Sequence, residues 1–338
     1  MHPKVSILIP CYNAEQWVGK AIESALEQTY PHTEVIVIDD GSTDNSLEII
    51  QSFGSKIQWA TQLNQGGNVT RNHLLERSTG QWLQYLDADD YLLPHKVGEQ
   101  IEHLKATKDK QANHKIDVLY SPSILEYRNH TSFTQEILPI PEPHDPWILL
   151  ARWYLPQTNS PLWRKQAIVD VGGWKETQPC CQEHELYLRL LQAGKSFQYC
   201  PSAGSIYRQW SETTTCKRNM HLTWKKRLEI EDGIETHLIE TGQMTVDRQW
   251  AINQARFECA RMIWLRDRCW AAQIIHQIHQ SQPRFLPRGT SAPKSYQLAY
   301  QFIGFEWAEE IADWKRKFLR NSTLEDNSPH TTVPNKYP

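Results

Sequence analysis

The chain has 338 residues, enough for one large domain or two smaller ones, and its formal net charge of −3 argues against bulk binding to nucleic acid. No apolar run approaches the roughly 20 residues that a membrane-spanning helix needs. The N-terminus has too short an apolar run for a secretion signal, so we expect a cytoplasmic protein, and contact with the inner face of a membrane stays open. The seven cysteines are irregularly spaced, which is typical of reduced thiols.

Short apolar runs alternate with helical patterns over the first hundred residues. The expected strands are residues 5–9, 35–38, 57–60 and 82–86. Helical patterns separate them, and Pro94 opens a further helix after the fourth strand. This β-α-β alternation predicts an α/β fold, in which helices cover both faces of a mostly parallel sheet.

Polar residues follow three of these strands. They are the segments 10–13 (PCYN), 39–40 (DD) and 87–90 (DADD). Ligands of parallel sheets bind in the crevice beyond the carboxyl ends of the strands. We therefore expect the three segments to converge on one site.

The third segment places three carboxylates within four residues, at Asp87, Asp89 and Asp90. Side chains with like charge repel one another at this spacing, but a hard divalent cation takes oxygen ligands of this kind. A cation held there also bridges a diphosphate. The cluster therefore predicts Mn²⁺ or Mg²⁺ with a nucleotide substrate, and a turn that only caps the next helix is the alternative.

The second half of the chain changes character. A strand is expected at 117–120, a proline-rich connection at 139–146 and a last strand at 197–199. Long helical patterns rich in Trp, Arg and Glu then follow. We expect three parts: a catalytic domain over 1–215, a helical region over 216–320, and a disordered tail over 321–338.

Several stretches together resemble the inverting family 2 glycosyltransferases of the GT-A fold. These are VSILIPCYNAEQWVGKAIESALEQTYPHTEVIVIDDGSTDNS, NQGGNVTRN, GQWLQYLDADDYLLP, VGGWKE and QEHELYLRL, in that order. The resemblance covers residues from about 4 to 210. It implies a Rossmann-like sheet flanked by helices, a nucleoside-diphosphate sugar as donor and a divalent metal as cofactor.

The resemblance also implies which residues hold the donor. The matching positions are Pro10, Tyr12, Glu15, Asp39, Asp40, Arg71, Asp87 and Asp89. Tyr12 would stack near the base, and Asp40 would accept a hydrogen bond from the base or ribose. Two positions have a second interpretation: Glu15 as a helix first-turn acid, and Arg71 as one half of a surface ion pair.

For the metal, the resemblance favours Asp89 as the direct ligand. Asp87 is a second ligand or a contact to the ribose or donor sugar, and Asp90 is the doubtful member. The catalytic base is expected at the start of the helix after residue 181. Gln182 and Glu183 stand where the family usually has Glu-Asp, so Glu183 is the first choice and Glu185 the second.

These roles imply transfer of a sugar, with a UDP-sugar as the first expectation, to a hydroxyl of a polysaccharide, glycan or lipid-linked saccharide. The departure at Gln182 motivates an alternative, a catalytically weak module that binds nucleotide sugars or acts as a scaffold. Trp174 either stacks on a sugar or belongs to the core. Residues 305–320 form an amphipathic pattern compatible with core packing, a homodimer contact or a membrane surface.

Overall fold

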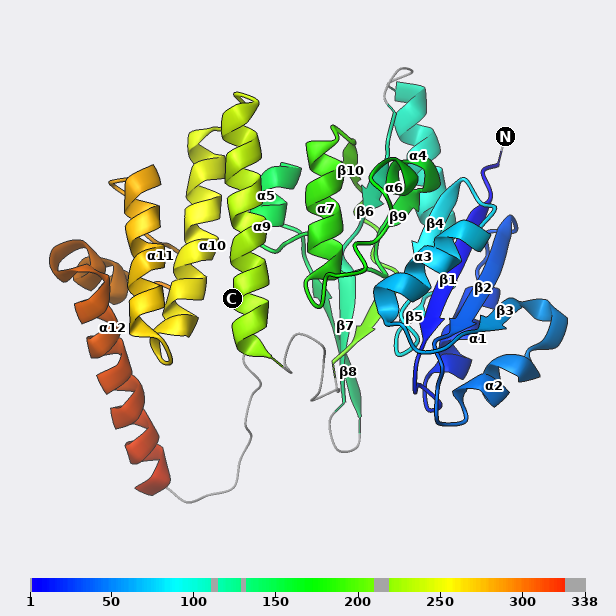
Figure 1. Ribbon diagram of the computed structural model, residues 1–338, viewed down its shortest axis with the longest axis horizontal. Helices are drawn as coiled ribbons and strands as arrows, with labels where there is room; N and C mark the ends of the chain where they lie inside the picture. The colour runs from blue at the N-terminus through cyan, green and yellow to red at the C-terminus, as the bar shows by residue number, and fades with distance from the viewer. Residues whose placement is uncertain (1, 111–114, 129–131, 210–218, 326–338) are drawn as a thin grey trace. The chain divides into compact units, whose positions relative to one another are not determined.

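The computed structural model describes residues 2–110, 115–128, 132–209 and 219–325, and the chain divides into two compact units, 1–226 and 227–338 (Figure 1). The division falls within helix α9 (Met220–Glu240), a little later than the boundary expected at 215. Helix α12 (Lys294–Glu325) reaches into the segment where the terminal tail is expected. The remainder of that tail lies outside the described residues.

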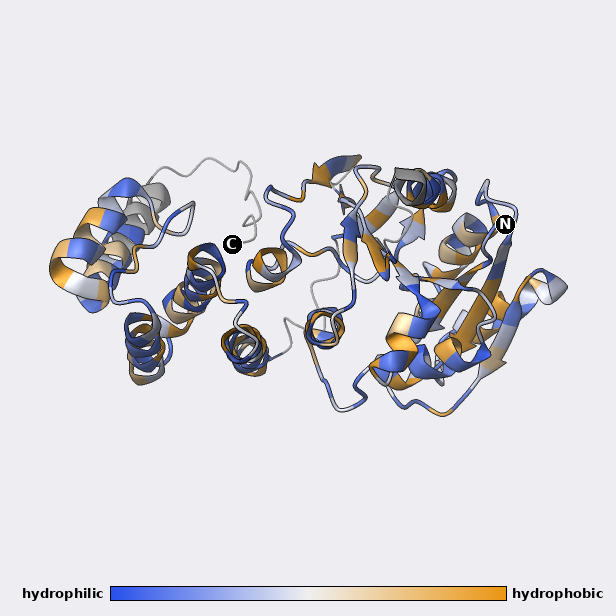
Figure 2. Ribbon diagram, turned by 90° about the horizontal axis from the view of Figure 1, so that it is seen from above, coloured by the Kyte–Doolittle hydropathy of each residue, from blue (hydrophilic) through white to orange (hydrophobic). Residues whose placement is uncertain are grey.

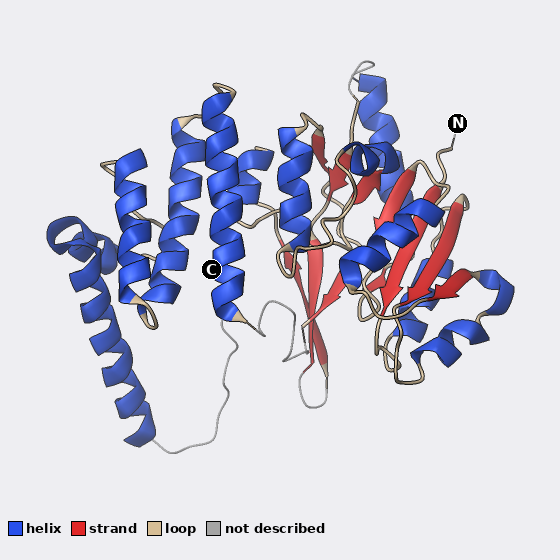
Figure 3. Cartoon of the chain, in the orientation of Figure 1, coloured by secondary structure: helices blue, strands red, loops and turns tan. Residues whose placement is uncertain are grey.

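The first unit is built on a seven-stranded sheet with the order β10-β6-β9-β4-β1-β2-β3 (Figure 3). Its strands are β1 (Val5–Cys11), β2 (Thr33–Asp39), β3 (Gln58–Thr61), β4 (Trp82–Tyr85), β6 (Val118–Tyr120), β9 (Leu162–Arg164) and β10 (Phe197–Tyr199). All neighbours pair in parallel except β9, which is antiparallel to both β4 and β6. The expected mostly parallel α/β sheet is confirmed.

Strand β1 is longer than the sequence predicts, because Pro10 does not end it. The strand continues to Cys11, whose carbonyl accepts the N–H of Asp40, while the Leu8 carbonyl accepts the N–H of Leu86 on the other side. Backbone groups of alternate residues point to opposite neighbours, so Pro10 faces the β4 side. Pairing with β4 has already ended at Leu8, and the missing proline N–H therefore costs no ladder bond.

Helices cover the sheet and bury both of its faces. They are α1 (Val18–Leu26), α2 (Ser46–Ser52), a short 3₁₀ turn η1 (Gly54–Lys56), α3 (Gly67–Arg77), α4 (Lys96–Lys110), α6 (Lys165–Asp170) and α7 (Gln182–Gln192). Ile7 and Ile9 of β1 pack with Val18 and Ile22 of α1 in one apolar cluster. Leu8, on the opposite face of the strand, is also fully buried. Burial on both faces explains the consecutive apolar residues 7–9, and Figure 2 shows hydrophobic residues along the central strands.

A second sheet, which was not predicted from the sequence, lies beside the acidic cluster. It has the order β5-β11-β7-β8 and consists of β5 (Tyr91–Leu92), β11 (Ser205–Arg208), β7 (Ser123–Arg128) and β8 (Phe133–Leu138). The proline-rich connection is confirmed up to residue 145. Helix α5 (Pro146–Ala151) then begins, with the Asp145 carboxylate accepting the N–H groups of Trp147 and Ile148.

The second unit is helical, as expected, with most of α9 followed by α10 (Val246–Trp264), α11 (Arg268–Ser281) and α12. Arg256 is fully buried in α10 and is paired with Asp232 at 2.6 Å and Glu235 at 2.7 Å. Helix α12 changes direction at Gly304, which has a φ of 78°. Within the described ranges, no helix combines the length and apolar character needed to cross a membrane. The cytoplasmic location stays a prediction.

Candidate functional site

The loops that follow β1 and β2 are tied together by hydrogen bonds. The Asn13 N–H donates to Ser42 Oγ at 3.0 Å, and the Thr43 N–H donates to Asn13 Oδ1 at 2.8 Å. Tyr12 precedes Asn13 and exposes about half of its surface, 51%. A half-exposed aromatic ring on a loop that is fixed on both sides is a suitable stacking surface for a planar ligand.

Asp39 and Asp40, at the end of β2, are both buried but have different partners. Asp39 accepts a hydrogen bond from Thr61 Oγ1 at 2.9 Å. Asp40 accepts from the side chain of Gln62 at 2.8 Å and from the backbone N–H groups of Gln65 at 3.0 Å and Gly66 at 2.8 Å. The Asp40 carboxylate therefore organises the glycine-rich loop at the N-terminus of α3, beyond any role toward a nucleoside.

Glu15 does not lie in the first turn of a helix, which corrects that interpretation. Helix α1 begins only at Val18, and Glu15 sits in the turn before it. Its carboxylate accepts the backbone N–H of Asn45 at 3.1 Å, while its own N–H donates to Asp44 at 3.0 Å. Glu15 thus links the two loops after β1 and β2.

The acidic cluster after β4 contains three carboxylates in three different environments. Asp87 forms an ion pair with Arg71, with 2.7 Å between Oδ1 of Asp87 and Nη2 of Arg71. Asp89 is exposed, and its carbonyl accepts a hydrogen bond from Arg208. Although the side chain is exposed, the protein nearby reduces its solvation, and this desolvation and then the charge of Asp87 raise the pKa of the Asp89 carboxyl. Asp87 and Asp89 therefore remain the two members available to a ligand.

Asp90 is buried and serves the second sheet. Its two oxygens accept hydrogen bonds from the Asn159 side chain and from the Arg208 N–H, both at 2.9 Å. Burial, and then the charges of Asp89 and Asp87, raise its pKa well above the usual value. This geometry explains why Asp90 was the doubtful metal ligand. No sequence signal pointed to Asn159, because 69 residues separate the partners.

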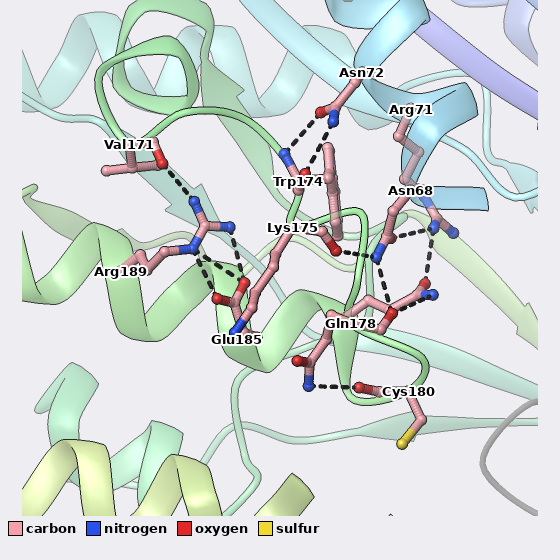
Figure 4. Close-up of polar contacts among 11 residues, drawn as sticks. Asn68, Arg71, Asn72, Val171, Trp174, Lys175, Gln178, Cys180, Glu185 and Arg189 are labelled. Carbon is pink, nitrogen blue, oxygen red and sulfur yellow. Dashed lines mark hydrogen bonds and ion pairs between the residues drawn. The ribbon is translucent and has the colours of Figure 1, made fainter. Parts of the chain in front are cut away.

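Helix α3 presents three polar side chains to the segment that leads into α7 (Figure 4). Asn68 donates to the carbonyls of Lys175 and Gln178, and Arg71 donates to Gln182 Oε1 at 2.9 Å. Asn72 forms two bonds with the Trp174 backbone, 2.8 Å from its N–H and 2.9 Å to its carbonyl.

Residues 68, 71 and 72 have i, i+3, i+4 spacing and so share one helical face. That spacing stands in NQGGNVTRN, and it could have revealed the shared role of the three side chains.

Arg71 is the residue that joins the two acidic regions. Its side chain is 10% exposed, so it is not part of a surface ion pair. One nitrogen bonds Asp87 after β4, and the other bonds Gln182 at the first position of α7. Its guanidinium also lies over the ring of Trp174, 5.0 Å from the centroid. Gln182, which stood out in the sequence only as a departure from a pattern, is thus a direct partner of Arg71.

Trp174 belongs to the core, and the sugar-stacking alternative is wrong in this structure. The residue is 2% exposed and packs edge-on against Tyr85 at 5.2 Å. One of its faces supports Arg71, so neither face is open to a saccharide.

Glu183 and Glu185 lie on either side of His184 in the sequence, and their side chains contact different residues. Glu183 Oε1 lies 3.5 Å from Nδ1 of His184, whose ring stacks on Trp153 at 3.8 Å. Burial acts to raise the pKa of Glu183, but His184 and then the more distant Arg71 outweigh it, and the net pKa is lowered. Glu183 is therefore an ionised carboxylate, and its side chain remains 24% exposed.

Glu185 is committed to an ion pair within its own helix. Its two oxygens accept bonds from Arg189 at 2.8 to 3.1 Å, and Arg189 also donates to the Val171 carbonyl. Figure 4 shows this group turned away from Arg71 and Asn68. A carboxylate paired in this bidentate way is poorly placed to take a proton from a ligand.

A divalent cation is compatible with the donor set at Asp87 and Asp89. Arg71 pairs with Asp87, whereas Arg208 pairs with Glu126 at 3.6 Å and donates to the backbone carbonyl of Asp89. Across the described residues, no group of three or more His, Cys, Asp or Glu side chains is arranged to hold a metal. Mg²⁺ needs no such cage, because it binds through one or two carboxylates together with substrate phosphates.

The mostly parallel sheet, with an acidic cluster beyond its strand ends, defines the GT-A class of fold. Crystal structures of S. aureus TarS residues 1–349 share this architecture. The form in complex with UDP-GlcNAc aligns with a TM-score of 0.61 at 15% identity, over 93% of this chain and 92% of that one. A second crystal structure of the same TarS fragment aligns with a TM-score of 0.58, also at 15% identity, over 93% of this chain and 91% of that one.

Residues 6–158, a little under half of the chain, match the family described as glycosyl transferase family 2. A glycosyltransferase of Haemophilus influenzae is 40% identical over 106 residues, 30% of this chain and 42% of the relative. The putative teichuronic acid biosynthesis glycosyltransferase TuaG of Bacillus subtilis is 36% identical over 107 residues, 30% of this chain and 42% of the relative. The match thus covers about two fifths of the length of each of these relatives.

Proposed function

We propose that the protein is an inverting glycosyltransferase that transfers a sugar from a nucleoside-diphosphate donor to a hydroxyl acceptor. The observation that carries the proposal is Arg71, which contacts both Asp87 at the end of β4 and Gln182 beside Glu183. One guanidinium thereby holds a donor-side carboxylate and the start of the base-bearing helix together. The family match over residues 6–158 supports the same chemistry.

For the donor, we propose a UDP-sugar. Tyr12 offers a half-exposed ring for the base, and Asp39 and Asp40 lie at the neighbouring strand end, where they pair with the Cys11 backbone. Three donors already bond Asp40, so its remaining acceptor capacity is small, and Asp39 shares the contact to the nucleoside. The likeness to TarS, solved with UDP-GlcNAc, supports the uridine nucleotide.

For the chemistry, we propose Glu183 as the base. Its lowered pKa keeps it ionised, and its position one residue from Gln182 places it next to the Arg71 network. Glu183 would take the proton from the acceptor hydroxyl as that oxygen attacks the anomeric carbon from the side opposite the leaving diphosphate. Glu185 is the weaker candidate because Arg189 holds both of its oxygens.

Mn²⁺ or Mg²⁺ would be held by Asp89, with Asp87 as the second protein ligand. Bound there, the cation would supply positive charge to the diphosphate that leaves. Arg71 would hold Asp87 in place, and Arg208 would fix the backbone of Asp89 through its carbonyl. As acceptor, we propose a growing polysaccharide or a lipid-linked saccharide, which the relative named for teichuronic acid synthesis supports.

The test has two stages. A thermal-shift screen of nucleoside-diphosphate sugars, with and without Mn²⁺, identifies the donor, because a ligand that binds only the folded state raises its apparent stability. Donor turnover is then compared in Glu183→Gln and the matched control Glu185→Gln. We expect the first change to lower turnover at least about 100-fold, within the range for loss of a general base, and the second to leave most of it.

Equal losses in the two variants, or full turnover in Glu183→Gln, would remove Glu183 from the base role. Donor binding without turnover on any saccharide acceptor would instead support a nucleotide-sugar-binding module.

A further inference from the structure

An exposed apolar face lies on the second segment of α12, after its change of direction at Gly304. Trp307 is 67% exposed, Ile311 is 41% exposed and Trp314 is 65% exposed. The opposite side of the same segment is packed into the second unit through Phe305 and Ala308. The segment therefore has two apolar sides, and only one of them is buried. Clustered exposed aromatics of this kind mark an interaction surface.

The spacing of these residues is that of a coiled-coil seam. Intervals of four and then three residues, from 307 to 311 and from 311 to 314, place Trp307, Ile311 and Trp314 at successive d, a and d positions of a heptad. A seam of this kind is completed by a second helix with the same spacing.

The charges beside the seam select that second helix. With Ile311 at an a position, Glu310 occupies the preceding g position and Lys315 the following e position. In a parallel pair, g of one helix meets the next e of its partner, so Glu310 meets Lys315 on each side. An antiparallel pair would bring like charges together.

We propose that this face of α12 binds the same face of a second copy of the chain, forming a parallel homodimer. The self-complementary arrangement of Glu310 and Lys315 is the observation that favours a second copy. It goes beyond the proposed transferase activity, and it uses residues of the second unit alone.

A membrane surface is a poorer partner for the same face. A helix that lies on an anionic bilayer carries mainly basic residues on its polar flanks. Here one flank carries the acidic residues Glu306, Glu310 and Asp313, and the last two are paired with Arg268 and Arg316, so this flank is not the basic one that such a helix presents. The mixed flanks match a protein partner that bears both signs of charge.

The first test is the oligomeric state of the full chain by sedimentation equilibrium, from about 1 to 100 μM, the range in which a modest interface associates. We expect a dimer that Ile311→Lys weakens at least about tenfold, since it places a charge at the centre of the seam. Leu265→Lys is the matched control, because Leu265 is another exposed branched aliphatic side chain of the second unit, with 60% of its surface exposed. It should leave the dimer unchanged.

The second test reverses the charges. Glu310→Lys and Lys315→Glu should each weaken the dimer, and the double variant should restore it. Glu310 also pairs with Arg268 at 2.7 Å, so its single variant loses that contact as well. Five residues place Glu310 and Lys315 on opposite flanks of one helix, so their mutual rescue requires two chains.

A chain that stays monomeric at 100 μM would overturn the proposal, and so would a dimer that Ile311→Lys leaves intact. Flotation with vesicles of phosphatidylserine and phosphatidylcholine provides the remaining arm. A monomeric chain whose binding to these vesicles is lost in Ile311→Lys would assign the face to a membrane instead.

Discussion

Replacing Arg71 by Met should destabilise the first unit by about 2 kcal/mol. The change removes the ion pair to Asp87 and the hydrogen bond to Gln182 while keeping the apolar stem near Trp174. Breaking a fully buried pair costs about 3–5 kcal/mol, whereas an exposed pair is worth about 0–1 kcal/mol. The Arg71 side chain is 10% exposed and that of Asp87 is 33% exposed, so the expected cost lies between these limits.

A double-mutant cycle isolates the pair. Urea unfolding of the wild-type chain, Arg71→Met, Asp87→Asn and the double variant should give a coupling of about 1–2 kcal/mol, because the second change costs less once its partner is gone. The Asn72→Ala variant is a control on the same helical face, and it should not couple to Asp87→Asn. Additive effects of Arg71→Met and Asp87→Asn would refute the claim that these two side chains hold each other.

Three further changes test the electrostatics of the first unit. His184→Phe keeps a ring stacked on Trp153 but removes the side chain that lowers the pKa of Glu183. Because the ionised base is lost as pH falls through that pKa, the acidic limb of the rate profile should move to higher pH. An unmoved limb would contradict this role of His184. The pKa of Glu34 is about 2, because its bonds to Lys4, Ser6 and Thr79 outweigh burial, which acts to raise it. Glu34→Gln should therefore cost about 2 kcal/mol at pH 7, after a discount for the half-exposed Lys4, and this cost should vanish as pH falls from about 4.5 toward 2 in urea titrations. Asn159→Leu leaves the buried Asp90 carboxylate without one donor and should cost about 2–3 kcal/mol by the same titrations, whereas a cost below about 0.5 kcal/mol would mean that water replaces the amide.

β1, β2 and β4 could be predicted because they are largely buried and rich in apolar residues, whereas β3 is mostly exposed and was expected at 57–60 from its apolar residues alone. Residues 7–9 of β1 and 35–38 of β2 are continuous apolar runs, and a turn or a helical pattern separates each strand from the next element. β9 has only three residues, and its partners in β4 precede it by some 80 positions. β8 is exposed throughout, so burial imposed no alternation on its sequence. β6 and β10 also have only three residues, but they were predicted at 117–120 and 197–199 from their apolar and aromatic residues, so length alone does not decide whether a strand is recognised.

The candidate site divides in a similar way. Topology alone placed Asp40 and Asp87 at strand ends on one edge of the sheet, as observed. Their partners depend on contacts between distant segments, such as Arg71 with Gln182, 111 residues apart. Glu183 and Glu185 could not be separated by helical position, since both are in the first turn of α7. The ion pair to Arg189 separates them, and only the folded chain shows it.

The close approach of α3 to the segment before α7 has an evolutionary consequence. A Cβ at Gly173 would lie 2.6 Å from Asn72 Oδ1, the atom that accepts the Trp174 N–H. The φ of 73° at Gly173 adds strain for any other residue. Gly173 and Asn72 should therefore be inherited as a pair. A lineage that lost Asn72 would free position 173 of its steric limit, and covariation of the two positions among related sequences would record it.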